Sequence, residues 1–182
     1  IKLFMGKAEI TRRFIIETAA PLFNEKGIAG TSIDDVLKAT KVAKGCLYGH
    51  FSSKEELSQA MVDHLLQQVT NHTMARLNQE DTAEAKLLAF MDMHRNPSCT
   101  IADGGCPIIN FGVESDDTNP VIRQKIKSAI QKTVKLLSSI IQDGIDQKEF
   151  SSSTDADAFA LKLFAAIEGG IMISRVTGNN KY

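Results

Sequence analysis

The chain has 182 residues and a mass of 19.9 kDa, enough for one well-cored unit or two small ones. Its formal net charge of −1 excludes a polycation that coats nucleic acid or anionic membranes, and 43% hydrophobic with 24% charged residues is typical of a globular protein. No apolar run approaches the roughly 18 residues of a membrane span and no signal-peptide pattern opens the chain, so we expect a cytoplasmic protein with no membrane partner.

The spacing of apolar residues is helical almost throughout, and no stretch alternates long enough to require a strand. The sequence therefore predicts an all-α fold. The expected helices cover residues 8–26, 33–40, 44–50, 54–78 and 83–95, a short segment from Pro107, about 27 residues from Pro120, and 155–176.

Helix boundaries in the first third of the chain carry recognisable signals. Gly27 follows the first helix, as glycine does after many helix C-termini. Ser32 with Asp35, and Ser53 with Glu56, have the spacing of capping boxes that begin the second and fourth helices. Residues 1–60 carry nine basic and seven acidic side chains, so this segment is positive while the remainder of the chain has a net charge of −3.

The stretch from Gly27 to Leu57 predicts a helix-turn-helix, because two short helices are separated by a three-residue turn. In this arrangement the first helix braces against the DNA backbone and the second enters the major groove, which is wide enough for a helix. The second helix and its neighbours display groups that suit phosphate contacts: Lys44, Tyr48, His50, Lys54, Thr31 and Ser32. Alternatively, Tyr48 and Phe51 are core aromatics and the lysines are solvated surface.

Three runs resemble the DNA-binding domain of the TetR family: residues 27–33 (GIAGTSI), 42–51 (VAKGCLYGHF) and 53–57 (SKEEL). Members of that family are homodimeric bacterial transcription regulators, mostly repressors released by a small molecule. The resemblance implies a helix-turn-helix three-helix domain over residues 1–53, a ligand-sensing and dimerisation domain over 54–182, and a palindromic double-stranded DNA operator. It also implies phosphate contacts from Lys44, Tyr48, His50 and Lys54, with Thr31 and Ser32 at the front of the bracing helix and Gly45 and Cys46 facing base edges.

Two residues depart from the family's pattern. Lys41 stands where the family usually has a turn glycine, so a lysine is expected at positive φ, where its charge also comes within reach of a phosphate. Ala43 replaces the usual serine cap and cannot accept a hydrogen bond from the recognition helix. These departures motivate an alternative function: a helical dimeric ligand-binding or interaction module with little DNA affinity.

The last helix predicts a homodimer, because apolar or small residues surround most of its circumference and such a helix is buried on more than one side. The resemblance agrees, since the family dimerises through its last two long helices. The segment from Gly104 to Phe111 also resembles a motif that some family members have in the helix linking the ligand-sensing domain to the DNA-binding domain. Close approach of two copies is expected at small residues: Ala165, Ala166, Gly169 and Gly170.

A cavity for an unknown small-molecule effector is expected among the middle helices. Aromatic and methionine side chains at helical spacing are more often core, whereas a carboxylate inside an apolar helix, Glu168, must pair or face a wet cavity. The candidate lining residues are Phe90, Met91, His94, Phe111, Phe164, Glu168 and Met172.

Catalysis and cofactors are not expected. The three cysteines have irregular spacing and form no disulfide framework. A metal site can be drawn from His94, Cys99 and Cys106 with Asp92 and Asp103, but these spacings fit no compact ligand pattern, and a redox-sensing thiol at Cys99 or Cys106 has no further support. The sequence displays no catalytic triad, phosphate-binding glycine loop or paired carboxylate motif, so an all-α enzyme is disfavoured.

Overall fold

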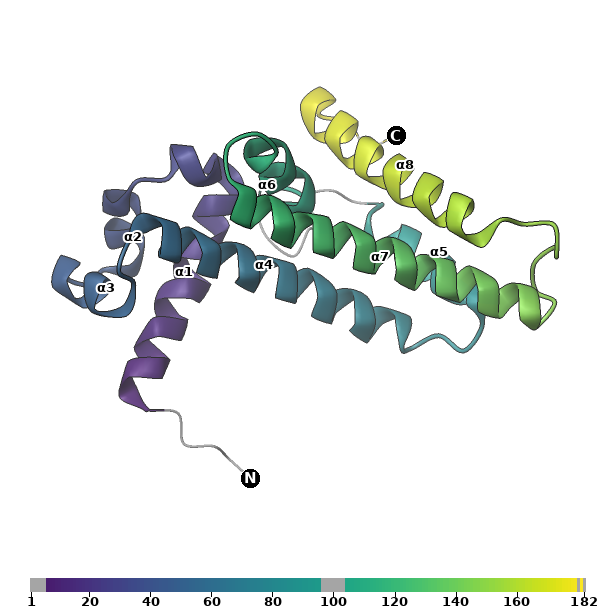
Figure 1. The fold of residues 1–182 in the computed structure, drawn as a ribbon, viewed down its shortest axis with the longest axis horizontal. Coiled ribbons are helices and arrows are strands. Elements are labelled where there is room, and N and C mark those ends of the chain that lie inside the picture. The colour runs from purple at the N-terminus through teal and green to yellow at the C-terminus, as the bar shows by residue number, and fades with distance from the viewer. Residues whose placement is uncertain (1–5, 96–103, 180, 182) are drawn as a thin grey trace.

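A computed structural model describes residues 6–95, 104–179 and 181 of the chain, and within them the regular structure is helical (Figure 1). The all-α prediction is confirmed, and the helices begin and end within a few residues of the expected positions. They are α1 (Lys7–Gly30), α2 (Ile33–Thr40), α3 (Lys44–His50), α4 (Lys54–Leu77), α5 (Ala83–Met93), α6 (Pro107–Ser115), α7 (Pro120–Asp146) and α8 (Ala156–Thr177).

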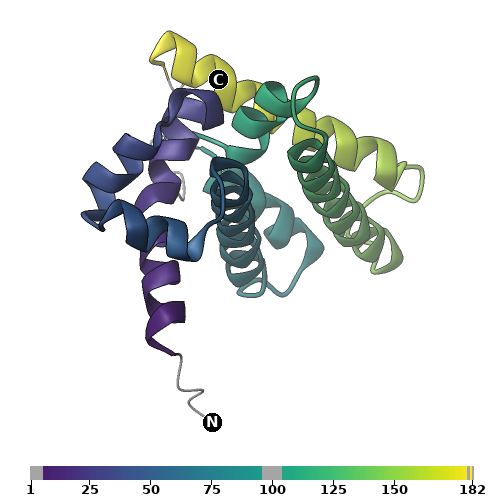
Figure 2. The ribbon, with the colours of Figure 1, turned by 60° about the vertical axis from the view of Figure 1, so that its left-hand side comes forward.

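The short helices α2 and α3 lie at one end of an elongated molecule, together with the start of α4 (Figure 1). The long helices α4 and α7 run beside each other along the molecule, and α8 packs against α7 on the side away from α4 (Figure 2). The short helix α6 contacts α1, α4 and α7. It is therefore placed between the helix-turn-helix end and the long helices.

Two serine-based caps determine where α2 and α4 begin. The predicted capping box is present at α2, where Ser32 and Asp35 exchange hydrogen bonds, and those from the Ser32 hydroxyl and N–H hold the pKa of Asp35 well below its ordinary value. At α4, Ser53 accepts from the N–H of Glu56 as expected. The Glu56 carboxylate, however, accepts from the N–H and hydroxyl of Ser52 at 2.8 and 2.7 Å, one residue earlier than predicted.

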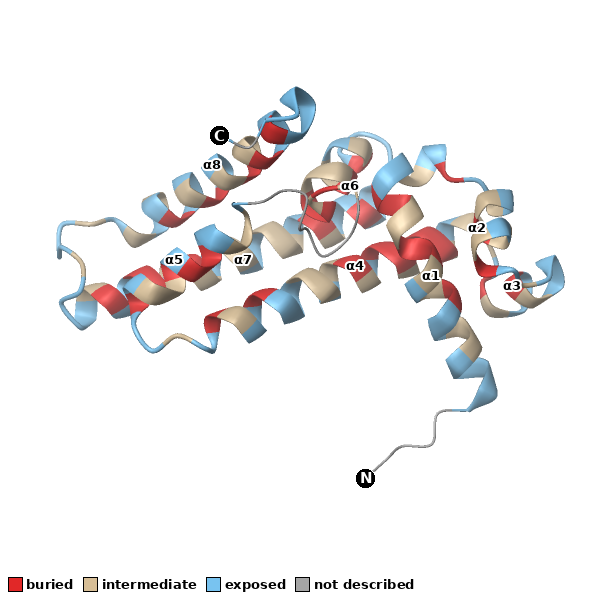
Figure 3. Ribbon diagram, turned by 180° about the vertical axis from the view of Figure 1, so that it is seen from behind, coloured by how far each residue is buried: buried red, intermediate tan, exposed pale blue. Residues whose placement is uncertain are grey.

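The core is formed by the helix faces that point toward one another, and the opposite faces are exposed (Figure 3). Burial of each large apolar side chain stabilises the fold by about 1.5–3 kcal/mol. The largest fully buried side chains are Phe23, Phe51, Phe111, Ile15, Leu47, Leu57, Met61, Leu65, Ile122, Leu137, Ile141 and Val36.

Gly27 interrupts α1 near its C-terminal end, with φ 75° and ψ 172°. This region of backbone conformation is open essentially to glycine alone. The expected end of the first helix at Gly27 therefore becomes a break, after which residues 28–30 complete a last turn. No helix of the described residues combines the length and apolar character that a membrane span requires.

Candidate functional site

The helix expected to enter the major groove, α3, has one fully buried side chain. Leu47 is its buried residue, whereas Lys44, Gly45 and Tyr48 are exposed. Tyr48 retains 44% of its accessible surface, so the core alternative does not apply to it. That alternative does apply to Phe51, which is buried beneath the Arg12 guanidinium, 4.4 Å from the ring centroid.

The turn between α2 and α3 has both of the expected departures from the family's pattern. Lys41 adopts the left-handed conformation, with φ 57° and ψ 20°, and its N–H donates to the carbonyl of Leu37 at 2.8 Å. A non-glycine residue in this region costs about 1–2 kcal/mol. Ala43 precedes α3 in an extended conformation and supplies no side-chain cap.

The other predicted DNA-facing residues differ in accessibility. Thr31 is fully buried, and its hydroxyl donates to the carbonyls of Gly27 and Leu22 at 2.7 and 3.3 Å. Ser32 is exposed, but its hydroxyl is engaged in the cap of α2. Cys46, His50 and Lys54 are half-buried, with Lys54 as the first residue of α4. The hydroxyls of Thr31 and Ser32 are therefore both engaged within the protein.

A carboxylate on α6 binds the main chain of α1 at the Gly27 break. Glu114 accepts hydrogen bonds from the N–H groups of Ile28, at 2.8 Å, and Ala29, at 2.7 Å, one on each carboxylate oxygen. A Cβ at position 27 would lie 2.9 Å from a Glu114 oxygen, so the glycine provides space as well as conformation. These charged hydrogen bonds join α1, at the helix-turn-helix end of the molecule, to α6, which packs beside the long helices.

An asparagine pair strengthens the same α1–α6 contact. The Asn110 side-chain amide donates to the carbonyl and the side-chain oxygen of Asn24, both at 3.1 Å, and to the carbonyl of Gly104 at 3.0 Å. Asn24 is buried and donates in turn to the carbonyl of Gly105 at 2.9 Å. Gly104 has φ 100°, and a Cβ there would meet the Asn24 carbonyl oxygen at 2.6 Å, so glycine is required for this approach.

The beginning of α6 contacts the middle of α8 through an acid and a thiol. The Cys106 thiol donates to Oε1 of Glu168 at 3.1 Å, and burial raises the pKa of both groups. Oε2 of Glu168 is buried without a hydrogen-bond partner among the described residues. A raised thiol pKa disfavours the reactive thiolate at Cys106. Two residues of the hypothetical metal set, Cys99 and Asp103, lie outside the described residues.

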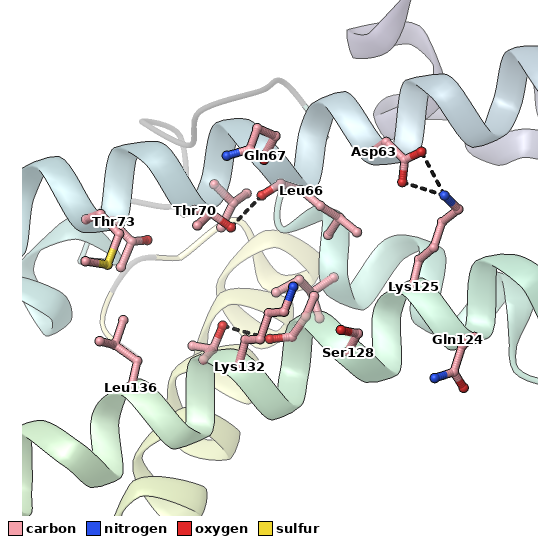
Figure 4. Close-up of a pocket in the computed structure, with 15 residues that line it drawn as sticks. Asp63, Leu66, Gln67, Thr70, Thr73, Gln124, Lys125, Ser128, Lys132 and Leu136 are labelled. Carbon is pink, nitrogen blue, oxygen red and sulfur yellow. Dashed lines mark hydrogen bonds and ion pairs between the residues drawn. The ribbon is translucent and has the colours of Figure 1, made fainter.

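A cavity of about 710 Å³ lies between α4 and α7, with Ile108 of α6 contributing to its wall (Figure 4). Its polar and apolar side chains alternate along the two long helices, which gives a mixed surface large enough for a small organic molecule. The lining residues are Asp63, Leu66, Gln67, Val69, Thr70, Thr73, Met74, Ile108, Gln124, Lys125, Ser128, Ala129, Lys132, Thr133 and Leu136.

None of the seven residues expected to bind an effector lines this cavity. Phe111 is fully buried in the core, and Phe90 packs against His94 with ring centroids 4.9 Å apart. Burial lowers the pKa of His94, whose Nδ1 lies 2.7 Å from the carbonyl oxygen of Phe90. Met91 and Met172 are exposed, and the last two candidates, Phe164 and Glu168, are buried on α8. A cavity among the middle helices is present, but other side chains form it.

The outer face of α8 is rich in exposed apolar groups. Ala165 and Ala166 are exposed, Gly169 and Gly170 are half-buried, and a Cβ at Gly169 would have no neighbour within 4 Å. The large apolar side chains exposed on this helix are Phe159, Leu161, Met172, Ile173 and Val176.

Comparison with known proteins assigns both halves of this arrangement. Residues 15–61 match the family described as bacterial regulatory proteins, tetR family, and residues 83–182 match the tetracyclin repressor-like C-terminal domain. The chain belongs to the TetR family. It is thus a TetR-family transcriptional regulator.

Whole-chain relatives support this assignment. A TetR-family regulator from Cytophaga hutchinsonii is 38% identical, with a TM-score of 0.93 over 99% of this chain and 90% of that one. A TetR regulator from Chloroflexus aurantiacus is 36% identical, with a TM-score of 0.91 over 97% and 89%. The HTH-type transcriptional repressor DhaR of Mycobacterium sp. (strain GP1) is 24% identical over 93% of this chain and 85% of that protein.

In this TetR-family chain, sequence reasoning overlooked Glu114 and the residues that line the α4–α7 cavity. The signal for Glu114 was indirect, because Gly27 indicates a break in α1 whose following N–H groups need an acceptor. The Asn110 contact falls within the segment that resembles the linking helix, and the structure places that segment against α1.

Proposed function

We propose that this TetR-family regulator is a homodimeric repressor that binds a palindromic operator and is released by a small molecule in the α4–α7 cavity. The observation that carries the proposal is α3, a short helix fixed by Leu47 whose outer face presents Lys44 and Tyr48. A helix anchored at one side and exposed at the other suits insertion into the major groove. His50 at the end of this helix, with Lys41 before it and Lys54 after it, occupies a position that suits phosphate contacts, and Gly45 and Cys46 face the base edges.

A second copy of the chain is the proposed partner of α8. The apolar side chains exposed on this helix, together with Ala165, Ala166, Gly169 and Gly170, form a surface on which two helices can approach closely. A two-fold dimer places two α3 helices about one DNA turn apart, which matches a palindromic site. Residues 1–53 then act as the reading domain and residues 54–182 as the sensing and dimerisation domain.

Release by an effector requires coupling between the cavity and the reading helices. Ile108 lines the cavity and Glu114, six residues later on α6, holds the main chain of α1. The α4 helix also lines the cavity, and its first residue is Lys54. An effector that alters the distance between α4 and α7 therefore shifts both α6 and the start of α4, and with them the helix-turn-helix. Its contacts then differ between the DNA-binding and the released arrangement, and release requires this difference.

Binding of the purified protein to DNA from the region upstream of its own gene tests this proposal. We expect a specific complex whose affinity falls steeply with salt, as phosphate contacts require. Lys44→Ala and Lys54→Ala should each weaken binding to all sequences and reduce the salt slope by about one unit. Lys127→Ala, on the exposed face of α7, serves as the matched control and should leave the slope unchanged.

The strained turn supports a second candidate, a TetR-like helical dimer that binds ligands or partners and has little DNA affinity. Lys41 at positive φ and Ala43 without a capping group both loosen α3. Such a module shows no salt slope on random DNA, whereas a repressor shows a steep one. Ala43→Ser restores a cap worth about 1 kcal/mol, so it should raise the free energy of unfolding and tighten operator binding if α3 reads DNA.

A further inference from the structure

The charged groups of the α4–α7 cavity are unequally paired. Lys125 Nζ lies 2.7 Å from both carboxylate oxygens of Asp63, so this lysine and the only acid among the described lining residues satisfy each other. Lys132 also lines the cavity, makes no ion pair with any described carboxylate, and directs its Nζ toward α4 (Figure 4). The charge left over in the cavity is therefore positive.

A hydroxyl lies beside this free ammonium group. Ser128 precedes Lys132 by one helical turn and lines the same cavity, and no described residue accepts from or donates to its hydroxyl. The neighbouring hydroxyls of Thr70 and Thr133 are already engaged, donating to the carbonyls of Leu66 and Ala129 at 2.9 and 3.0 Å. Ser128 and Lys132 are thus two donors in the cavity that no described residue engages.

Apolar side chains form a further part of the cavity wall. The cavity combines side chains from three helices, and its volume of about 710 Å³ lies within the range of sites for small organic ligands. Apolar contact favours a ligand with an aliphatic or aromatic portion. The apolar lining residues are Leu66, Val69, Met74, Ile108, Ala129 and Leu136.

We propose that the cavity binds an amphipathic anion, an oxyanion group joined to an aliphatic or aromatic body. The oxyanion lies against Lys132 Nζ and the Ser128 hydroxyl, and the body packs against the apolar wall beside Leu66 and Ile108. A cationic ligand is disfavoured because Asp63, the acid that would receive it, already binds Lys125 through both oxygens. This inference rests on the proposed function, in which the cavity is the effector site.

Two fluorescent probes with one aromatic body test the charge preference: 8-anilinonaphthalene-1-sulfonate, and N-phenyl-1-naphthylamine, which lacks the sulfonate. Titrated into the full chain, the sulfonate should bind more tightly than the neutral probe. Lys132 is exposed at the edge of the cavity, so Lys132→Gln should weaken the sulfonate by roughly three- to fivefold, the upper range for an exposed charged pair, and leave the neutral probe within about twofold. Lys127→Gln, an exposed lysine on the same helix outside the cavity, should change neither affinity.

A cavity-filling variant locates the binding site. Ala129→Phe places an aromatic ring in the cavity and should weaken both probes, with the helical content of the variant checked by circular dichroism. The proposal is overturned if the two probes bind equally well, if Lys132→Gln weakens both alike, or if a folded Ala129→Phe still binds both.

Operator binding measured on the same protein samples separates this inference from the proposed function. Lys127 lies on α7, away from α3, so the Lys127→Gln control should bind operator as the unaltered chain does. An intact operator complex without charge preference in the cavity overturns the ligand class alone. Loss of the operator complex in the unaltered chain overturns the proposed function, whatever the probes show.

Discussion

The two faces of α6 hold the molecule together by different chemistry. One face packs apolar side chains, including Ile108 and the fully buried Phe111, among the long helices. The other face binds α1 through Asn110 and Glu114, which recognise main-chain atoms at 2.7–3.1 Å. Apolar burial is non-directional, whereas a hydrogen bond weakens steeply as its geometry changes.

This difference suits the proposed release mechanism, in which α6 responds on one side and acts on the other. The apolar face can follow a change in the spacing of α4 and α7 without losing its burial. The polar face must then either carry α1 along or release it. We therefore expect substitutions on the apolar face to affect the stability of the whole molecule, and those on the polar face to act first on α1.

The largest effect is expected for Phe111→Ala. Removal of a fully buried phenyl ring should lower the free energy of unfolding by about 3–5 kcal/mol, since it loses burial and leaves a cavity. Chemical denaturation followed by circular dichroism measures this change. Val113→Ala is the control on the same helix, because Val113 is 73% exposed, and it should change the stability by less than about 0.5 kcal/mol. A loss below about 1 kcal/mol for Phe111→Ala would contradict the apolar role of this face.

A smaller and more local effect is expected for Glu114→Ala. Removing the charged acceptor of these hydrogen bonds should lower the free energy of unfolding by about 1.5–3 kcal/mol. It leaves the N–H groups of Ile28 and Ala29 without their acceptor. Hydrogen exchange at these two amides should accelerate more than exchange in α7. Asp117→Ala removes an exposed acid just beyond the same helix and should leave the exchange unchanged. Equal acceleration throughout the chain would show that Glu114 acts on global stability instead.

The smallest effect at any single pH is expected for Glu168→Gln, on α8, where the carboxyl group faces Cys106 at the N-terminal end of α6. Burial raises the pKa of Glu168 above its ordinary value of 4.5, so the folded chain keeps a proton that the unfolded chain has lost. Stability should therefore fall as the pH rises from about 4.5 through the raised pKa. The neutral glutamine keeps the acceptor for Cys106 and should flatten this decline. Thermal unfolding between pH 5 and 8 measures it, and parallel curves for both chains would refute the assignment.

The sequence was most informative where structure is local. The capping box of Ser32 and Asp35 and the positive φ of Lys41 involve residues close in the chain, and both are present as expected. The one-residue difference at α4 shows the limit of such reasoning. Ser52 and Ser53 are both serines before a helix, and spacing alone does not decide which N–H the Glu56 carboxylate accepts.

None of the side chains predicted to bind an effector lines the α4–α7 cavity, and the reason is physical. Apolar and aromatic residues such as Phe111 and Phe164 were taken as candidates, but their hydrophobicity is satisfied by the core. The cavity is instead lined largely by polar residues of α4 and α7, which in a sequence look like the solvent-facing side of an amphipathic helix. Whether such residues face water or a cavity depends on the distance between two helices, which no local pattern records.

Because of the α1–α6 contact, evolutionary substitutions at positions 27 and 114 depend on each other, although the two positions are far apart in the chain. A side chain at position 27 would occupy the space of the Glu114 carboxylate, and it could not adopt the backbone conformation found there. Replacement of Gly27 is therefore compatible with this fold only when position 114 becomes smaller and the chain turns differently. Relatives that keep the acid at 114 should keep glycine at 27, and the two should be lost together.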